Sequence, residues 1–112
     1  MDLKNQIYFP HEKTIVQSAA KNVQRRILAC CDELMCVENY FEEGAVGVLH
    51  SHPHTQITYV VSGKFRFTVD EKTYEVSAGD TLLKKDGVIH GCTCLSAGVL
   101  LDIFTPMRKD FL

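Results

Sequence analysis

Residues 44–63 have the sequence GAVGVLHSHPHTQITYVVSG, and the pattern of this stretch decides the fold. Val46 to His50 and Gln56 to Val61 are short runs enriched in valine and other residues that favour strands. A His- and Pro-containing segment connects the two runs, and Gly44 and Gly63 bound the whole stretch. The stretch therefore predicts two β-strands joined by a short loop.

The same pattern continues to the C-terminus. From about residue 44 onward, short segments rich in Val, Ile, Thr, Phe and Tyr alternate with turns that contain Gly or charged residues. The expected strands are Val46 to His50, Gln56 to Val61, Lys64 to Val69, Thr73 to Val76, Thr81 to Lys84, Ile89 to Leu95 and Val99 to Phe104. The expected turns include Ser62-Gly63 and Ser96-Ala97-Gly98. Such closely spaced strands predict an all-β sandwich or closed barrel, because closure removes exposed strand edges.

The N-terminal third is less periodic. Residues 34–41 fit a helical period almost as well as they fit strand alternation, so periodicity alone does not choose between the two. The β-rich sequence that follows favours two further strands, from about Arg26 to Cys31 and from Leu34 to Phe41.

Length and composition indicate one folded domain. The chain has 112 residues, of which 46% are hydrophobic and 23% charged, and its formal net charge is -2. The twelve Lys and Arg residues form no basic stripe, which argues against nucleic acid as a partner. Runs such as Val99 to Leu101 are far shorter than the roughly 20 residues that span a bilayer, and Met1 to Gln6 contains no apolar signal core. We therefore expect one cytoplasmic domain over residues 1–112, without a membrane partner.

The cysteines and the outward strand faces complete this expectation. The five cysteines are odd in number and lack Cys-x-x-Cys spacing, so we expect mostly buried thiols, with Cys92 and Cys94 able to share a strand face.

A domain of this size buries only about two thirds of its unfolded surface. If Gln56 points inward, the alternate residues Ile57, Tyr59 and Val61 form an apolar outer face. Another sheet or a second subunit can cover that face, and a homodimer is the expected state.

Four histidine and glutamine residues have the spacing of a metal site. His50 and His52 are two residues apart, and on one strand they would point to the same side. Gln56 begins the next expected strand and offers an amide oxygen. His90 follows a glycine turn and would complete the set from the opposite wall. His50, His52, Gln56 and His90 are therefore the predicted metal ligands.

The chemistry of these ligands predicts the kind of ion and of substrate. Three imidazoles and an amide are all neutral, so a divalent ion keeps its positive charge and attracts anionic oxygens. The donors suit Zn, Ni, Fe, Mn or Co, and affinity order alone does not choose among these transition metals. His54 is left out of the set because Pro53 breaks the register, and His11 because it lies in a sparse N-terminal segment.

The spacing resembles that of the cupin superfamily. Its first motif is matched by Gly44, five residues, His50-x-His52, three residues, Gln56, six residues and Gly63, and its second by Gly79, Gly87 and His90. The chain departs from the family pattern at Lys85 in place of Pro, at Cys94 in place of Asn and at Gln56 in place of Glu. The resemblance implies an RmlC-like jelly-roll, a double-stranded β-helix barrel. It also implies a single small cupin domain with its metal-binding core at about residues 22–106.

The C-terminal segment LDIFTPMRKDFL, residues 101–112, narrows the resemblance. Together with HSHPHTQ at residues 50–56 and RRIL at residues 25–28, it is similar to the pectin-degradation cupins of the KdgF type. This likeness implies a metal-dependent enzyme of uronate catabolism that opens a 4,5-unsaturated monouronate, a small anionic sugar acid, to a linear keto acid. It also implicates the positions of Asp102, Phe104 and Arg108 in the site.

Burial cost and chain position leave two alternatives each for Asp102 and Arg108. Asp102 and Phe104 share a strand face, and burying a carboxylate costs several kcal/mol unless it is paired. An inward Asp102 would therefore line a wet cavity, and the alternative is an outward Asp102 in solvent. Arg108 follows Pro106 and can fold over the barrel mouth to hold a carboxylate, or else remain a solvated tail charge.

Two other functional classes stay open from the sequence. The cupin resemblance also covers dioxygenases with a mononuclear metal, and oxygen uptake separates these from an isomerase. The second alternative is a non-catalytic cupin that binds a metal or a small ligand, because one barrel carries many chemistries.

Overall fold

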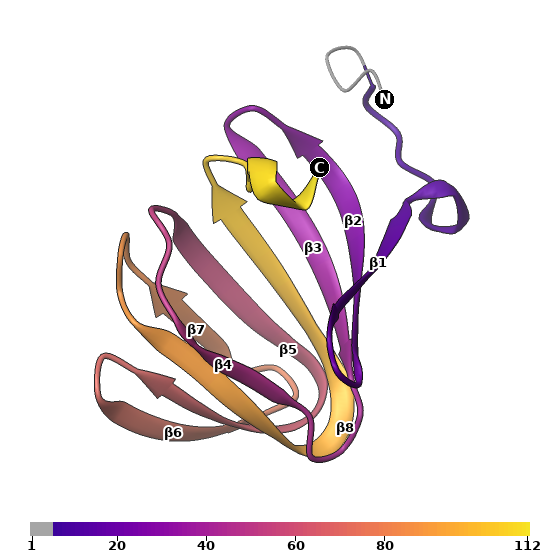
Figure 1. Cartoon of the computed structure of the whole chain (residues 1–112). Helices are drawn as coiled ribbons and strands as arrows, with labels where there is room; N and C mark the ends of the chain where they lie inside the picture. Colours follow the sequence, from indigo (N-terminus) through magenta and orange to yellow (C-terminus); the bar gives the residue numbers. More distant parts are fainter. Residues whose placement is uncertain (1–5) are drawn as a thin grey trace.

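Two long strands, β5 (Thr55–Val69) and β8 (His90–Thr105), organise the fold (Figure 1). The computed structural model describes residues 6–112, so most of the N-terminal segment in which the sequence showed no signal core lies outside the described residues. Each long strand was predicted as two strands separated by a turn. Those two turn predictions are wrong, because the chain bends at both places without leaving the sheet.

Glycine is required at these bends because the backbone of the paired strand lies too close for a side chain, and not because the chain reverses direction. A Cβ on Gly98 would lie 2.1 Å from the Ser62 carbonyl oxygen, and a Cβ on Gly63 would lie 2.5 Å from the Ser96 carbonyl oxygen. The pairing of β5 with β8 also shifts register between Val60 and Phe65, as β-bulges do where a strand bends. Gly-containing turns and Gly-containing bends have the same sequence signature, which explains the error.

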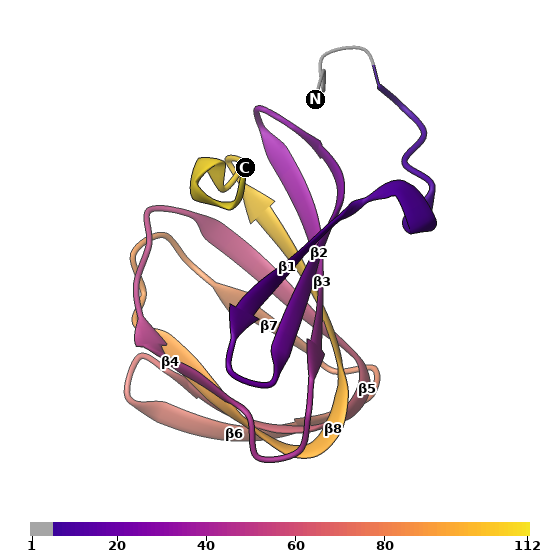
Figure 2. The ribbon, with the colours of Figure 1, turned by 45° about the vertical axis from the view of Figure 1, so that its right-hand side comes forward.

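The bends divide the sheet into two layers. The larger layer contains β1 (Ile15–Ala20), β2 (Val23–Cys31), β3 (Leu34–Phe41), the C-terminal half of β8, the N-terminal half of β5 and β7 (Thr81–Lys84). The smaller layer contains β4 (Val46–His50), the N-terminal half of β8, the C-terminal half of β5 and β6 (Lys72–Ser77). In the turned view, β4 and β6 lie on one side and β2 and β3 on the other (Figure 2). The predicted all-β jelly-roll barrel is confirmed.

The N-terminal boundary of the barrel differs from the prediction. β3 has the predicted bounds, and β2 begins three residues earlier than expected, at Val23. β1 was not predicted, although it pairs with β2 from Ile15 to Ala20, so the β structure begins before residue 22. The sequence of β1, IVQSAA, has few large apolar residues because it is an edge strand with half of its positions exposed. At the other end, Met107 is also buried, one residue beyond the expected core.

The inner faces of the two layers form the core. β5 alternates as expected, with Gln56, Thr58 and Val60 buried and Ile57, Tyr59 and Val61 exposed by 44%, 41% and 46%. Two apolar clusters fill the barrel, and their buried members are Val23, Ala45, Val60, Phe65, Phe67, Val76, Cys94 and Leu100 in one and Ile27, Cys30, Met35, Val37, Phe104 and Met107 in the other. All five cysteines are free thiols, but the expectation that most are buried is wrong, because only Cys30 and Cys94 are buried. No helix among residues 6–112 is long and apolar enough to cross a membrane.

Two short 3₁₀ turns lie outside the strands. The first, η1 (His11–Lys13), precedes β1, and the second, η2 (Lys109–Phe111), ends the chain. Figure 1 shows η2, in yellow, beside the ends of β2, β3 and β8. The C-terminal segment therefore lies over one end of the barrel.

Candidate metal centre

Three histidines, of which His50 is exposed and His90 is buried, converge by a route that differs from the prediction. β4 and β8 pair so that His50 and His90 are direct partners across two adjacent strands. His90 therefore approaches from the strand next to His50 and not from an opposite wall. β4 ends at His50, so His52 lies in the connecting loop, and the expected placement of both residues on one strand is wrong.

The loop fixes His52 through its backbone. The carbonyl oxygen of His52 accepts hydrogen bonds from the backbone N–H groups of His54 at 2.8 Å and Gly87 at 3.1 Å. Gly87 adopts a φ of 76°, a conformation that favours glycine and that brings the turn after β7 against this loop. Two loops distant in sequence therefore hold His52 in place.

The ligand atoms of His50, His52 and His90 lie within 4.8 Å of one another. His50 Nδ1 lies 2.7 Å from the Val48 carbonyl oxygen, and His90 Nδ1 lies 3.1 Å from that of Val88. Because a carbonyl oxygen only accepts, each Nδ1 carries the proton and leaves the Nε2 lone pair available. This tautomer is the one in which a neutral imidazole binds a metal through Nε2.

The donor atoms nearest this group lack hydrogen-bond partners. Both ring nitrogens of His52 and the Oε1 atom of Gln56 are buried, and none has a partner among the described residues. A buried polar atom without a partner costs about 1–3 kcal/mol, and a ligand bound at these atoms would remove that cost. The set of three imidazoles and one amide oxygen fits a divalent metal.

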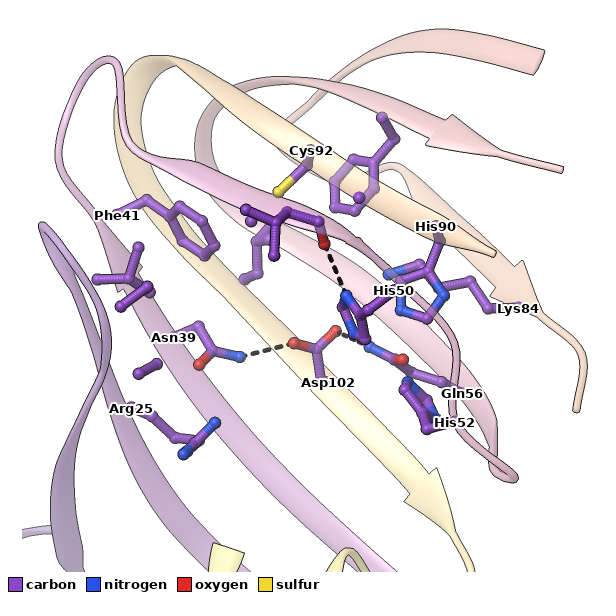
Figure 3. A pocket seen from close by; sticks show the side chains of 18 of the residues that line it. Arg25, Asn39, Phe41, His50, His52, Gln56, Lys84, His90, Cys92 and Asp102 are labelled. Atoms are coloured by element: carbon purple, nitrogen blue, oxygen red, sulfur yellow. Dashed lines mark hydrogen bonds between the residues drawn. The ribbon is translucent and has the colours of Figure 1, made fainter. Parts of the chain in front are cut away.

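The orientation of Gln56 follows from its neighbours. Its Nε2 donates to Asp102 Oδ1 at 2.8 Å (Figure 3) and lies 3.3 Å from Thr58 Oγ1. The side-chain carboxylate of Asp102 only accepts, so the NH₂ end of the amide must face it. Oε1 is thereby left as the unpartnered end of the side chain, which suits a metal ligand.

Asp102 lies on the inner face of β8, beside this centre. Its side chain is 6% exposed, and the alternative in which it faces solvent is wrong. Asn39 Nδ2 donates to its Oδ2 at 2.6 Å, while Gln56 Nε2 and Thr58 Oγ1 donate to its Oδ1 at 2.8 Å and 2.5 Å. The carboxylate is thus held from three directions, and Figure 3 shows the hydrogen bonds from Asn39 and Gln56.

The mouth of the barrel contains two guanidinium groups. Arg108 donates through Nε and Nη2 to the carboxylate of Asp110, at 3.0 Å and 2.8 Å. Arg25 on β2 donates through Nε to Gln17 at 3.0 Å and has no carboxylate partner within the part of the chain that is described. Both guanidiniums lie over the ring of Phe111, at 3.6 Å for Arg25 and 4.3 Å for Arg108. Arg108 is therefore partly buried, and its own neighbour already balances its charge.

Comparison with known proteins gives this architecture its family. The cupin domain model Cupin_2 matches residues 39–104. The pectin degradation protein KdgF of Dickeya dadantii (strain 3937) is 35% identical over 107 residues, which cover 94% of this chain and 97% of that protein. The chain is a cupin of the KdgF family.

Two solved structures superpose on nearly the whole of this cupin. An RmlC-like cupin from Shewanella frigidimarina NCIMB 400 has a TM-score of 0.89 and 36% sequence identity, covering 97% of each chain. KdgF from Halomonas sp. has a TM-score of 0.89 and 33% identity, covering 96% of this chain and 100% of its own. The single-domain jelly-roll expected from the sequence is thus shared with both relatives.

The cupin encloses a cavity of about 280 Å³ around the centre. The residues that line it and carry polar groups are Arg25, Asn39, His50, His52, Gln56, Lys84, His90, Cys92, Asp102 and Arg108. Phe104 forms an apolar wall, with its ring centroid 5.7 Å from that of His52. Burial raises the pKa of the Cys92 thiol to about 11, so this cysteine is protonated at neutral pH.

The histidines excluded from the predicted set also lie outside the group. His54 Nε2 is 3.3 Å from the Met107 carbonyl oxygen, and His11 is bound to Glu38 on the outer surface. Sequence reasoning missed three polar residues of the cavity, namely Arg25, Asn39 and Lys84, and it missed Thr58, which donates to Asp102. Strand pairing brings each of them to its place, and no spacing along the chain reveals it.

Burial keeps two of the imidazoles of this cupin neutral. It lowers the pKa of His52 to about 4 and that of His90 to about 3, with Arg108 and Lys84 respectively as the next causes. At neutral pH the imidazoles of His52 and His90 are therefore neutral, and neither must lose a proton before it binds a metal.

We expect the metal-free protein to lose stability as the pH falls from 6.5 towards 4. His52 and His90 bind protons in the unfolded chain below about pH 6.5, whereas in the folded chain they stay neutral down to about pH 4 and 3. The unfolded state therefore takes up more protons over this range, which favours unfolding.

Urea denaturation of chelator-treated protein at pH 7.5 and pH 5.0 measures this effect. The midpoint should be lower at pH 5.0 in the parent and in His11→Ala, since His11 is exposed and outside the centre. Equal midpoints at the two pH values in the parent would contradict the prediction.

Proposed function

We propose that this cupin opens the ring of a 4,5-unsaturated monouronate, giving a linear keto sugar acid, as a metal-dependent isomerase. One observation carries the proposal. A single cavity of about 280 Å³ contains a neutral metal-binding set, an inward carboxylate and two guanidiniums. The relative named for pectin degradation supports a uronate substrate.

The metal site would be formed by His50, His52, Gln56 and His90. These donors suit a divalent Zn, Ni, Fe, Mn or Co ion. When bound, such an ion supplies Lewis-acid polarisation of substrate oxygens, and its neutral ligands leave its charge undiminished. An anionic sugar acid is the substrate class that such a centre attracts.

Asp102 is the proposed proton acceptor. Its carboxylate borders the cavity, and the uncharged amides of Asn39 and Gln56 fix its position. It would take the proton of the hemiacetal hydroxyl while the bond between the anomeric carbon and the ring oxygen breaks. The ring oxygen leaves as an enolate, and return of the proton from Asp102 to carbon then gives the keto acid. The product is thus an isomer of the substrate, and no oxidant is consumed.

Arg25 and Arg108 are the proposed anchors of the substrate carboxylate, and Phe104 is the proposed apolar wall beside the sugar. Burial lowers the pKa of Arg25, and the nearby Arg108 lowers it further. Two cations held this close favour an anion between them. Arg108 shares its charge with Asp110, whereas Arg25, the other cation at the mouth, forms no ion pair with a carboxylate among the described residues.

Arg25→Ala and Arg108→Ala should each raise KM by about ten- to a hundredfold, the effect of a charged hydrogen bond worth about 1.5–3 kcal/mol. Steady-state kinetics with the unsaturated monouronate measures the change. Arg66→Ala is the matched control, because Arg66 pairs with Glu75 on the exposed surface. If both mouth variants keep the parental KM, Arg108 is a tail charge and Arg25 is structural.

The function itself is tested by ring opening of a 4,5-unsaturated galacturonate monomer, followed by loss of its enol-ether absorbance. Metal-loaded protein should exceed the spontaneous rate, and protein stripped with a chelator should not. A saturated galacturonate, which lacks the enol ether, is the control for binding without reaction. No acceleration by metal-loaded protein would disprove the proposed activity. Oxygen uptake in the same assay would instead indicate dioxygenase chemistry.

The proposed setting is the cytoplasm, with the sugar acid as the only small-molecule partner and no nucleic acid. We further propose a homodimer that covers the outer face of the larger layer. Ile57 and Tyr59 on β5 and Leu83 on β7 are exposed there by 44%, 41% and 57%. Light scattering should give a mass twice 12.6 kDa, and a monomeric mass at micromolar concentration would refute the dimer.

A further inference from the structure

Lys84 is the buried charge of this site that the proposed reaction does not use. Its side chain is 3% exposed, whereas every other lysine in residues 6–112 is exposed. β7 alternates between outward and inward positions, and Lys84 occupies an inward one, opposite Gln56 in the register of β5. Burying an ammonium group costs several kcal/mol, so a lysine here needs a compensating partner.

Lys84 contacts Thr58, which in turn contacts Asp102. Its Nζ donates to Thr58 Oγ1 at 2.8 Å and lies 4.5 Å from the centre of the Phe67 ring. No carboxylate of the described residues lies within ion-pair distance of it. The Phe67 ring gives the cation an aromatic face, but it does not explain why a charge lies beside the cavity.

Thr58 links Lys84 to Asp102 through two hydrogen bonds, and both donate towards the carboxylate. An ammonium only donates, so Thr58 Oγ1 accepts from Lys84. The single hydroxyl proton of Thr58 is then available for Asp102 Oδ1, which lies 2.5 Å away. The chain of hydrogen bonds therefore runs from Lys84 through Thr58 and ends on the carboxylate.

Asp102 supplies the negative charge at the end of this chain of hydrogen bonds. Its carboxylate accepts from Thr58, Gln56 and Asn39, and it donates to none of them. Burial lowers the pKa of Lys84, and the carboxylate of Asp102 opposes that effect. The two groups thus carry opposite charges and are bridged by one hydroxyl.

We propose that Lys84 is a positioning residue, namely the buried counter-charge of Asp102, which acts through Thr58. It keeps Asp102 an acceptor for the NH₂ group of Gln56, and so keeps Gln56 Oε1 free to face the histidines. The role differs from simple packing on Phe67, because it couples Lys84 energetically to Asp102.

A double-mutant cycle on the metal-free protein tests the coupling without any assay of activity. Lys84→Met should leave Asp102 uncompensated, and Asp102→Asn should leave Lys84 uncompensated, so each single variant should unfold at lower urea concentration. The double variant should lose less than the sum of the two losses. We expect a coupling of about tenfold in the unfolding equilibrium constant. Strictly additive losses would overturn the proposal.

A second variant keeps the test decisive if Lys84→Met does not fold. Thr58→Val removes the bridging hydroxyl at nearly constant volume and leaves both charges in place. Adding Lys84→Gln to Thr58→Val should then cost less stability than Lys84→Gln costs in the parent. An equal cost in both backgrounds would show that Lys84 does not act through Thr58.

The kinetic test of Lys84 rests on the proposed function. Lys84→Met, loaded with metal, should lower kcat about tenfold with little change in KM, because Lys84 acts on Asp102 and not on the substrate. The control is Lys85→Met, since the adjacent Lys85 is exposed, and its kcat should equal that of the parent. An unchanged kcat in Lys84→Met would overturn the positioning role. If the parent opens no ring, the proposed function fails, while the stability cycle still decides the pairing of Lys84 with Asp102.

Discussion

Replacing His50 and His52 together by alanine should abolish metal binding and reduce ring opening to the spontaneous rate. Two of the three imidazoles that lie within 4.8 Å of one another disappear in this variant. One histidine and one amide then remain, too few for a stable protein site for a transition metal, which takes three or four protein ligands. Metal content by mass spectrometry and absorbance of the unsaturated uronate measure the two losses.

His54→Ala is the control for this variant. His54 lies next to His52, with ring centroids 5.1 Å apart, but it lies outside the converging group. It should retain stoichiometric metal and parental kcat. Stoichiometric metal in the His50→Ala/His52→Ala variant would show that the ion binds elsewhere, and the assignment of the centre would be wrong.

Asp102→Asn should keep its metal and lose about 10²–10⁴-fold in kcat, the usual contribution of a positioned general base. The asparagine keeps the shape of the side chain but removes the charge and the proton-accepting oxygen. Metal content and kcat should be measured on the same preparation, because Asp102 also contacts Gln56. Glu75→Gln removes an exposed carboxylate and should change neither quantity.

The two measurements separate two roles of Asp102. A normal metal content with a parental kcat would exclude Asp102 as the proton acceptor. A loss of metal together with activity would instead show that Asp102 acts by orienting Gln56. Only retained metal with a large loss of kcat supports the proposed chemistry.

The fold was predictable wherever a short-range pattern determines the structure. Alternation in Gln56 to Val61 fixed the inward and outward faces of β5, and the β-rich context gave β3 its bounds. Gly63 and Gly98 misled the prediction because a glycine demanded by a neighbouring strand has the same appearance as a turn glycine. β1 was missed because an edge strand needs little hydrophobic pattern.

The site was predictable to the extent that its residues are close in sequence or carry a recognisable spacing. His50, His52 and His90 lie close together, although a loop and not a strand carries His52. Gln56 as a fourth ligand stays a prediction. Arg25, Asn39, Thr58 and Lys84 come from β2, β3, β5 and β7, and they meet only through strand register. A lysine in a strand normally indicates solvent, so nothing along the sequence marked Lys84 as buried.

The continuity of β8 has a mechanical consequence. This one strand carries His90 at its start and Asp102 near its end, in different layers. β5 likewise runs through both layers, with Gln56 in one half and Phe67 in the other. The layers therefore cannot slide past each other without bending two covalent backbones. The distance between His90 and Asp102 is therefore set by the curvature of a single strand, and not by the looser packing of separate elements.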